Sequence, residues 1–168
     1  LSLRRQRQMC IRDRFNIDAE VKESAHARVN LIGEHTDYTG GYVMPTLLSF
    51  KNTIEITENI TNEFIVYSQH FKEKKAFNDF KKSTNNEWVD YIKGCLHIFF
   101  EENKISSRYL NIYISSDIPL ERGISSSSAL CVATLKALNT FFETKIKDPE
   151  IAKLAKKVEF NYCLLYTS

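Results

Sequence analysis

The hydrophobic pattern of this chain changes its period near Glu87, and no other feature limits the possible folds as strongly. Before this point, apolar residues alternate with polar ones in short runs, as around Ile54 and Ile56, which is typical of β-strands. From Trp88 onward, apolar residues recur at the three- and four-residue spacing of an amphipathic helix. Only one more strand-like run, residues 108–119, follows among the helices. Strands first, then helices mixed with one strand, indicate an α+β layer rather than a regular βαβ array.

The same pattern gives approximate limits for the separate elements. We expect strands at residues 24–32, 43–48, 52–60, 62–69 and 108–119, and helices at residues 87–100, 130–141 and 149–162. The runs at 52–60 and 62–69 are expected to pair as a hairpin through the turn "TENITN". The polar segment 72–86 is expected to be a solvated loop or a short surface element.

Composition fits one ordinary globular domain. The chain has 168 residues, of which 43% are hydrophobic and 26% charged, so it is long enough to bury a core. No window holds the roughly 18 apolar residues that a membrane helix needs, and we expect no membrane partner. The four cysteines are far apart and form no CxxC pair. Free thiols in a reducing compartment fit this spacing, so we expect a cytoplasmic protein.

The two ends differ from the rest of the chain. Residues 1–14 hold five of the eight arginines and one aspartate, a net charge of +4 within a chain of net charge +2. A basic arm that binds nucleic acid and an organelle-targeting segment are two interpretations of this composition. We prefer a third, in which "MCIRDR" and "CLLYTS" are translated sequencing-adapter sequence at the edges of a gene fragment. On this interpretation, residues 1–14 and 163–168 are non-native or disordered, residues 15–162 form the folded unit, and nucleic acid is not a partner.

A cluster of ionisable residues follows the strand expected at residues 24–32. In "RVNLIGEHTDYTGGY", Glu34, His35 and Asp37 come just before a Gly-Gly turn, and Arg28 lies on the strand itself. One histidine and two carboxylates in one tight loop are not a standard zinc spacing. A sugar site needs convergent carboxylate and imidazole acceptors for its hydroxyls, which this loop supplies. From the residues alone, a metal site, a sugar site and a solvated turn all remain open.

A second polar loop, "GISSSSAL" at residues 123–130, lies between a strand and a helix. Gly123 permits a sharp turn with positive φ. The first N–H groups of the following helix have no partner within the helix, and the helix dipole adds partial positive charge there, so an anion such as phosphate fits. Neither the Walker A spacing nor GxSxG occurs. Serine runs also form plain N-caps and flexible turns, so this alternative stays open.

Three segments resemble one known family. "RVNLIGEHTDYTGGYVMP" resembles the galactokinase signature GRxNLIGEHxDYxxGxVxP. "IPLERGISSSSAL" resembles the phosphate loop PxxxGLSSSAxL, which galactokinases share with homoserine, mevalonate and phosphomevalonate kinases, and "WVDYIKG" resembles WxxYxKG. The three occur in the family order, within a resemblance over about residues 20–162. It implies an α+β fold: the N-terminal lobe of a two-lobed kinase, similar to domain 2 of ribosomal protein S5, with the second lobe outside this chain.

The resemblance also implies a reaction and roles for particular residues. Galactokinases transfer the γ-phosphate of ATP to the C1 hydroxyl of galactose, with Mg²⁺. Arg28 would face the transferred phosphate and the attacking hydroxyl. Glu34, His35 and Asp37 would bind galactose hydroxyls. The ATP phosphates would be wrapped by Gly123, Ile124, Ser125, Ser126, Ser127 and Ser128.

Three further roles concern the metal ion and the adenine. Ser127 would reach Mg²⁺ or a phosphate oxygen, and Glu159 in "AKKVEFNY" would be the carboxylate ligand of Mg²⁺. Trp88 and Tyr91 would lie near the adenine, although both also fall on the core stripe of their helix.

The family's catalytic aspartate has no counterpart within these residues. It belongs to a CGxxDQ segment further along the family's chains, so we expect these 168 residues alone to have little or no kinase activity. A monomer that binds galactose and ATP is expected. Two alternatives are a non-catalytic galactose and ATP sensor on the same fold, and a kinase for a related sugar such as N-acetylgalactosamine or arabinose.

Overall fold

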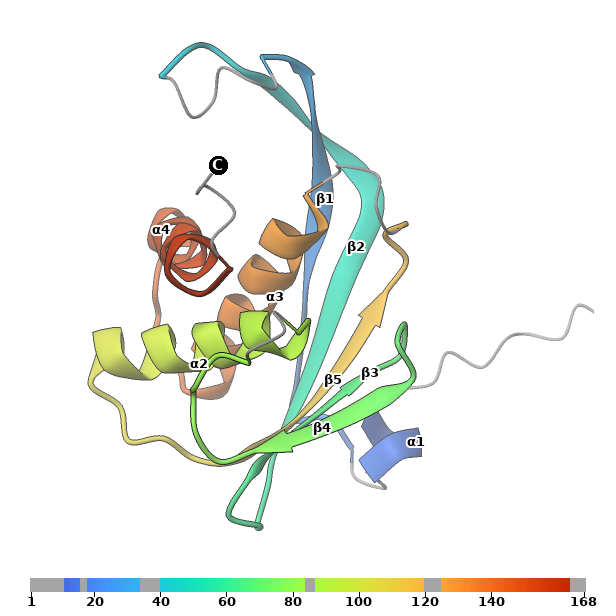
Figure 1. Cartoon of the computed structure of the whole chain (residues 1–168), viewed down its shortest axis with the longest axis vertical. Coiled ribbons are helices and arrows are strands. Elements are labelled where there is room, and N and C mark those ends of the chain that lie inside the picture. Colours follow the sequence, from blue (N-terminus) through green and yellow to red (C-terminus); the bar gives the residue numbers. More distant parts are fainter. Residues whose placement is uncertain (1–10, 16–17, 34–39, 84–86, 120–124, 164–168) are drawn as a thin grey trace, which may run out of the picture.

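A five-stranded sheet with helices on one face organises the molecule (Figure 1). The computed structural model describes residues 11–15, 18–33, 40–83, 87–119 and 125–163, and the structural statements below refer to these ranges.

The sheet consists of two hairpins joined by a strand from later in the chain. Its strands are β1 (Val21–Ile32), β2 (Met44–Glu58), β3 (Phe64–Ser68), β4 (Glu73–Phe77) and β5 (Leu110–Ser116). Their order is β1-β2-β5-β3-β4, and both β1–β2 and β3–β4 are antiparallel. The inserted strand β5 runs antiparallel to β2 and parallel to β3.

The expected hairpin between residues 52–60 and 62–69 is therefore wrong, because β5 separates β2 from β3. The physical reason is burial on both faces of β5: Ile112 points into the helix-covered core, and Tyr113 on the other face is also fully buried. A strand buried on both faces takes a central position in a sheet rather than an edge. The two runs expected at 43–48 and 52–60 form the single strand β2, and segment 72–86 includes the edge strand β4.

The helices cover one face of this sheet. They are α2 (Val89–Asn103), α3 (Ser126–Phe141) and α4 (Asp148–Val158), and α4 continues into a π-helical turn, η1 (Glu159–Cys163). The three expected helices are confirmed, with the end of the last one π-helical rather than α-helical. No helix in the described ranges is long and apolar enough to cross a bilayer.

The main core lies between the sheet and these helices. Phe64 on β3 is its aromatic centre: its ring lies 5.1 to 6.4 Å, centroid to centroid, from four others. The four partners are Phe77, Phe80, Phe100 and Tyr109. Fully buried aliphatic residues from every layer complete it, among them Ile54, Ile56, Ile92, Leu96, Leu110, Ile112, Leu135 and Leu138.

The opposite face of the sheet is covered in part by the short helix α1 (Ile11–Phe15), which the sequence did not predict (Figure 1). Buried Ile11 packs there against Tyr67 and Tyr113, whose rings stack with centroids 5.6 Å apart. The backbone N–H of Ile11 donates to the buried carboxylate of Glu55 at 2.8 Å. That residues 1–14 and 163–168 are non-native stays a prediction.

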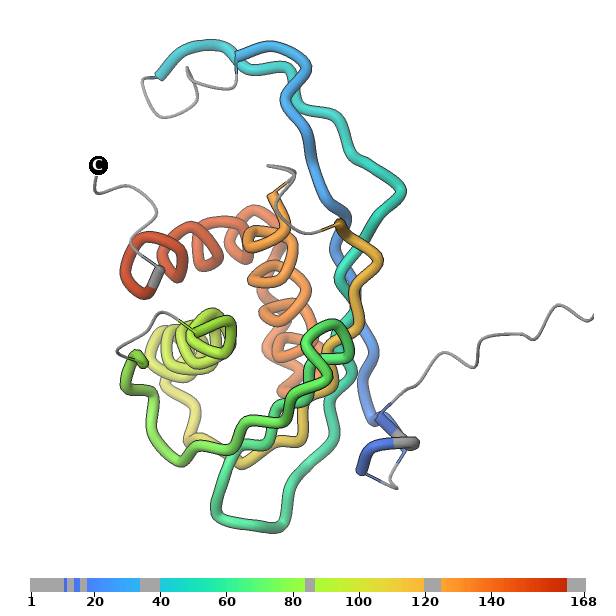
Figure 2. The backbone as a smooth tube through the Cα atoms, turned by 45° about the vertical axis from the view of Figure 1, so that its right-hand side comes forward, coloured from blue at the N-terminus to red at the C-terminus, as the bar shows by residue number. Residues whose placement is uncertain are grey.

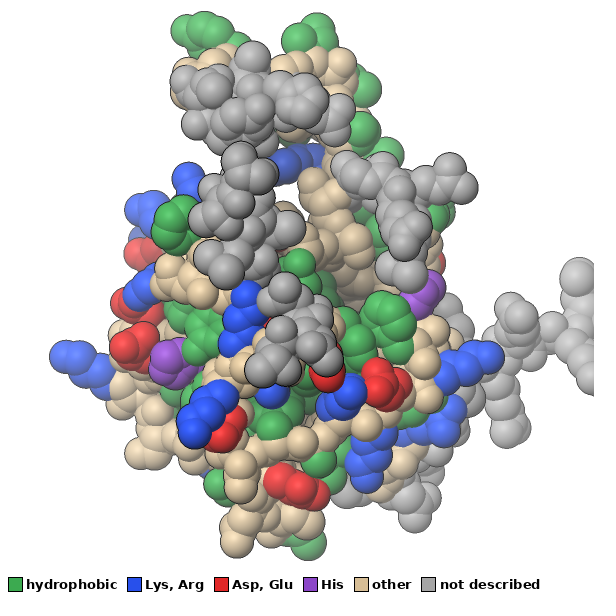
Figure 3. All heavy atoms as spheres, viewed as in Figure 1, with side chains coloured by type: hydrophobic (Ala, Val, Ile, Leu, Met, Phe, Trp, Pro, Cys, Tyr) green, Lys and Arg blue, Asp and Glu red, His purple; other side chains and the backbone are tan. Residues whose placement is uncertain are grey.

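Strands β1 and β2 continue past the helices as a two-stranded ribbon (Figure 2). The ribbon is rich in exposed apolar side chains: Ile32 is 67% exposed, Leu47 71% and Tyr42 99%. Hydrophobic side chains accordingly gather at its far end in the space-filling view (Figure 3). The residues expected to bind the sugar come between β1 and β2 in the sequence and lie outside the described ranges.

Candidate functional site

The start of α3 has an unusual backbone. Ser125, the residue before the helix, has a left-handed conformation with φ of 57°, which is uncommon for a residue with a side chain. Its side chain makes no capping hydrogen bond, and its carbonyl accepts the first helical bond from Ala129 at 3.0 Å. The Ser125 side chain therefore does not cap the helix start, which carries the positive partial charge of the helix dipole. This arrangement fits an anion.

Two serines of this helix start are joined to the carboxylate of Glu159. The Ser127 hydroxyl donates to Oε1 of Glu159 at 2.8 Å. The Ser128 hydroxyl oxygen lies 2.9 Å from Oε1 and 3.0 Å from Oε2. Residues more than thirty positions apart in the chain thus form one cluster, which joins the first turn of α3 to the first residue of η1. Both serines and Glu159 are half-buried, so the cluster is accessible to a ligand.

The negative charge of Glu159 also affects the pKa of a buried cysteine on α3. The Cys131 thiol, one turn further along α3, has a pKa well above its usual range. The causes are a hydrogen bond with Cys95, burial, and the charges of Cys95 and Glu159. Cys131 therefore stays a neutral thiol below the site.

The oxygen donors of this cluster fit a magnesium ion bound together with a nucleotide. Mg²⁺ is usually held by one or two carboxylates plus substrate phosphates, rather than by an all-protein cage. Glu159 supplies one carboxylate and Ser127 a hydroxyl oxygen beside it. In the part of the chain that the structure describes, no three His, Cys, Asp or Glu residues gather as a metal cage. The donor set therefore fits a metal ion that arrives with phosphate oxygens.

Strand β2 supports the same helix start through a residue that the sequence analysis missed. Asn52 is 3% exposed, and its side-chain amide donates to the carbonyl of Ser126 at 3.0 Å. A buried amide must be hydrogen-bonded, so Asn52 fixes the first turn of α3 against the sheet. The available signal was a single Asn at the start of the alternating run "NTIEITENI".

Strand β1 brings Arg28 to this region. Ala27 is fully buried and packs with Ile118 and with Ala129 of α3. Arg28 is the next residue, after a register shift, and is exposed opposite Leu47 of β2. Strand β1 thus carries an exposed arginine directly after the residue that contacts α3. The role predicted for Arg28 stays a prediction.

Several predicted site residues lie outside the described ranges. These are Glu34, His35 and Asp37 in the first loop, and Gly123 and Ile124 in the second. The described glycines on either side of the first loop both have positive φ, 90° at Gly33 and 79° at Gly40. Glycine adopts this backbone at little steric cost, so the sequence is suited to the loop's two ends.

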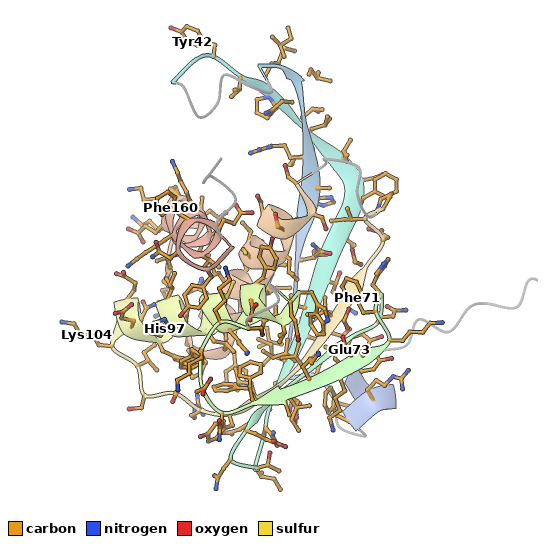
Figure 4. The ribbon with its side chains drawn as sticks, viewed as in Figure 1. Tyr42, Phe71, Glu73, His97, Lys104 and Phe160 are labelled. Atoms are coloured by element: carbon orange, nitrogen blue, oxygen red, sulfur yellow. The ribbon has the colours of Figure 1, made fainter. Side chains whose placement is uncertain are left out.

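Trp88, just before α2, contacts the β3–β4 hairpin at Phe71 and Glu73, which are labelled in Figure 4. Its indole N–H donates to Glu73 at 2.9 Å, and its ring stacks on the half-exposed ring of Phe71, with centroids 5.7 Å apart. The hydrogen bond from Trp88, followed by that from Lys75, lowers the pKa of Glu73 below its usual value. Tyr91 is half-buried against the main core. The adenine roles of Trp88 and Tyr91 stay predictions.

Comparisons with known proteins agree with this geometry. Residues 12–57 match the family model "Galactokinase galactose-binding signature", and residues 90–166 match "GHMP kinases N terminal domain". The first range contains Arg28 and the residues expected to bind the sugar, and the second contains α3 and Glu159. The galactokinase of Pyrococcus furiosus is 39% identical over 142 residues, which cover 84% of this chain and 39% of that protein.

Two solved structures share the fold. Lactococcus lactis galactokinase complexed with galactose has a TM-score of 0.80 at 27% identity, with 90% of this chain and 40% of that chain covered. Methanococcus jannaschii mevalonate kinase has a TM-score of 0.75 at 28% identity, with 82% and 45% covered. The chain spans about two fifths of the length of the curated relatives it matches. The expected α+β fold of an N-terminal kinase lobe is confirmed, and this chain belongs to the galactokinase family of GHMP kinases.

Proposed function

We propose that the protein to which this chain belongs is a galactokinase, which uses ATP to phosphorylate the C1 hydroxyl of galactose. One observation carries this proposal beyond family membership. The hydroxyls of Ser127 and Ser128 and the carboxylate of Glu159 converge at the open start of α3, beside the strand that carries the galactose signature. A phosphate site and a sugar signature thus lie on adjoining elements, as transfer between ATP and a sugar requires.

The ATP phosphates would lie at the start of α3. Residues 123–128 would donate backbone N–H groups, and the helix dipole would offset part of the negative charge. Glu159, with Ser127, would hold Mg²⁺, which when bound neutralises charge on the β- and γ-phosphates. Trp88 and Phe71 form a stacked aromatic surface at the start of α2, and a purine ring would add to such a surface, with Tyr91 nearby in the same helix.

The sugar would lie under the β1–β2 ribbon. Glu34, His35 and Asp37 would accept hydrogen bonds from galactose hydroxyls, and Arg28 would face the γ-phosphate. In the transfer, the C1 oxygen forms a bond to the γ-phosphorus, and the bond from that phosphorus to the β,γ-bridging oxygen breaks. Arg28 would stabilise the charge on the equatorial oxygens. The proton of the hydroxyl passes to a base that we do not assign within this chain.

We place the protein in the cytoplasm because Cys95 and Cys131 are free thiols, as is usual in a reducing compartment. That it acts as a monomer stays a prediction.

Binding to this chain tests the proposal without requiring turnover. Trp88 is the only tryptophan, so its fluorescence reports on the expected adenine site. We expect MgATP to change this fluorescence in a saturable way, and calorimetry to show galactose binding at least tenfold more tightly than glucose, which differs only at C4. Asp37→Asn should remove the preference for galactose. Equal affinity for the two sugars, or no binding of either, would contradict the galactokinase assignment.

A further inference from the structure

Glu159 is the first residue of a π-helical turn. The turn η1 (Glu159–Cys163) follows α4 directly and replaces the α-helical turn that the sequence predicts. π-helical turns are rare and are found mostly as single turns, frequently at functional sites. A wide turn of this kind needs contacts from outside to hold its shape. The contacts of η1 with α2 therefore bear on where the Glu159 carboxylate lies.

The first such contact is a close approach between Tyr162 and Gly94 of α2. A Cβ atom added at Gly94 would lie 2.8 Å from Cγ and 3.1 Å from Cβ of Tyr162. It would also lie 3.0 Å from Cγ1 of Val158, the last residue of α4. Real Cβ atoms essentially never approach another atom to 2.8 Å. Glycine at position 94 is thus what lets the Tyr162 ring rest on the backbone of α2.

The second contact is polar. The Tyr162 hydroxyl is hydrogen-bonded to Nδ1 of His97, one turn further along α2, and the His97 ring stacks on Phe80 with centroids 5.5 Å apart. Burial, and then the negative charge of Glu101, raise the pKa of Tyr162. The hydroxyl therefore stays protonated at neutral pH and keeps this bond. His97 is held in turn by Phe80, so Tyr162 is fixed at both ends of its side chain.

Helix α2 also contacts α3, at the residue next to Gly94. The Cys95 thiol, next to Gly94, lies 3.8 Å from the carbonyl oxygen of Cys131 on α3. Both cysteines are fully buried. Helix α2 thus contacts η1 through Gly94 and α3 through Cys95, while η1 reaches α3 through Glu159. Each of the three elements thus contacts the other two.

We propose that Tyr162 is a positioning residue, which rests on Gly94 and bonds to His97 to hold η1 in the shape that presents Glu159 to Ser127 and Ser128. The importance of this for catalysis rests on the proposed function, because Glu159 is there the carboxylate for the metal ion. The mechanical link between Tyr162 and the serine–carboxylate cluster needs no ligand. The spacing of "EFNY" and the glycine of "YIKG" then serve one purpose: to fix a carboxylate beside a phosphate site.

A double-mutant cycle on the ligand-free chain tests this link. Ser128→Ala, Tyr162→Phe and the double variant are compared with the original chain by denaturant unfolding. In the original chain, Ser128→Ala should raise the equilibrium constant for unfolding about tenfold, because it removes a hydrogen bond to a charged group. In the Tyr162→Phe background the same change should raise it only about two- to threefold, because the turn has already relaxed. Equal effects in the two backgrounds would overturn the proposal.

The chain offers a matched control in Tyr67. This tyrosine is buried, whereas Tyr162 is half-buried, and its hydroxyl has no hydrogen-bond partner among the described residues. Tyr67 lies on the opposite face of the sheet. Tyr67→Phe should leave the effect of Ser128→Ala unchanged. If Tyr67→Phe reduces that effect as much as Tyr162→Phe does, the coupling is a general property of the fold and the proposal fails.

A second measurement covers the case in which the double variant does not fold. In the single variant Tyr162→Phe, the amide chemical shifts of Ser127 and Ser128 should move, whereas in Tyr67→Phe they should not. Unmoved serine amides in Tyr162→Phe would overturn the proposal. Neither measurement uses ATP, so a chain that shows the coupling but binds no MgATP contradicts the proposed function and leaves the positioning role of Tyr162 intact.

Discussion

The hydroxyl oxygen of Ser128 lies within 3.0 Å of both carboxylate oxygens of Glu159, and this pair joins the first turn of α3 to the turn that ends α4. The two residues come from different helices, so their relative position depends on how those helices pack. The geometry offered to a bound group at this pair therefore depends on how the helices pack against one another.

Replacing Glu159 tests whether this carboxylate serves a metal ion. Glu159→Gln keeps the size and a hydrogen-bond acceptor for the serines, but removes the charge. We expect the tightening of ATP binding by Mg²⁺ to fall about tenfold, with binding of ATP alone unchanged or improved, because a negative charge beside the phosphates is gone. Calorimetry with and without Mg²⁺ measures both values. Glu102→Gln, which alters an exposed glutamate on α2, is the control, and an equal loss in that variant would count against a metal role.

Gly94→Ala should destabilise the chain. The added methyl group would overlap the Tyr162 ring, and overpacking of this kind costs about 1 to 3 kcal/mol. Denaturant unfolding measures the change in the free energy of unfolding. Glu101→Ala, an exposed position of the same helix, should change it by less than about 0.5 kcal/mol. Combining Gly94→Ala with Tyr162→Ala should remove much of the penalty, and a penalty that persists in full would show that the overlap lies elsewhere.

The pH dependence of Trp88 fluorescence should follow the titration of Glu73. The pKa of Glu73 lies below 4.5 in the folded chain, because Trp88 and Lys75 donate hydrogen bonds to its ionised form. These bonds therefore stabilise the folded chain above pH 4.5, and this stabilisation is lost as the pH falls through the lower folded value. We expect a fluorescence transition with its midpoint below pH 4.5.

Two variants distinguish this transition from general acid unfolding. Glu73→Gln should abolish it, because the titrating group is gone. Glu87→Gln removes the other carboxylate that pairs with Lys75 and should leave the transition in place, since the indole N–H of Trp88 donates its hydrogen bond to Glu73. A transition that survives in Glu73→Gln would assign it to another group.

The aromatic core should be most sensitive at Phe64. Its ring contacts four other aromatic rings and is almost fully buried, so Phe64→Ala should lower the free energy of unfolding by about 3 to 5 kcal/mol. Ile60→Ala is the comparison, because Ile60 is 99% exposed in the turn between β2 and β3 and should cost less than about 0.5 kcal/mol. A similar cost at both positions would mean that the core is not centred on Phe64.

Local patterns predicted the elements better than their arrangement. The alternation at Leu110, Ile112 and Ile114 and the helical spacing after Trp88 each predicted an element that the structure confirms. The pairing of β2 with β3 failed because a short turn between two strands does not show that a third strand will lie between them. That insertion depends on burial of both faces of β5, which alternation on one face does not reveal.

For the candidate site too, the sequence predicted single residues better than the contacts between them. A serine run before a helix and an acid near the end of another helix were visible in the sequence, and the resemblance assigned both to one site. Their contact, at 2.8 Å between Ser127 and Glu159, depends on helix packing. Asn52 and the π-helical turn at Glu159 were not found, because a lone buried amide and an irregular turn leave almost no periodic signal.

The central place of β5 also has a consequence for the order in which the molecule can fold. The pairs β1–β2 and β3–β4 are local hairpins, and each forms from neighbouring segments, whereas β5 must return from beyond α2 to join them. Contacts between distant segments form late, because the entropy of closing the intervening chain comes first. The five-stranded sheet therefore cannot be assembled until Leu110–Ser116 is available to join the two hairpins. The last strand to join the sheet precedes α3 and η1 in the chain, so the sheet has all its strands before Ser128 and Glu159 can meet.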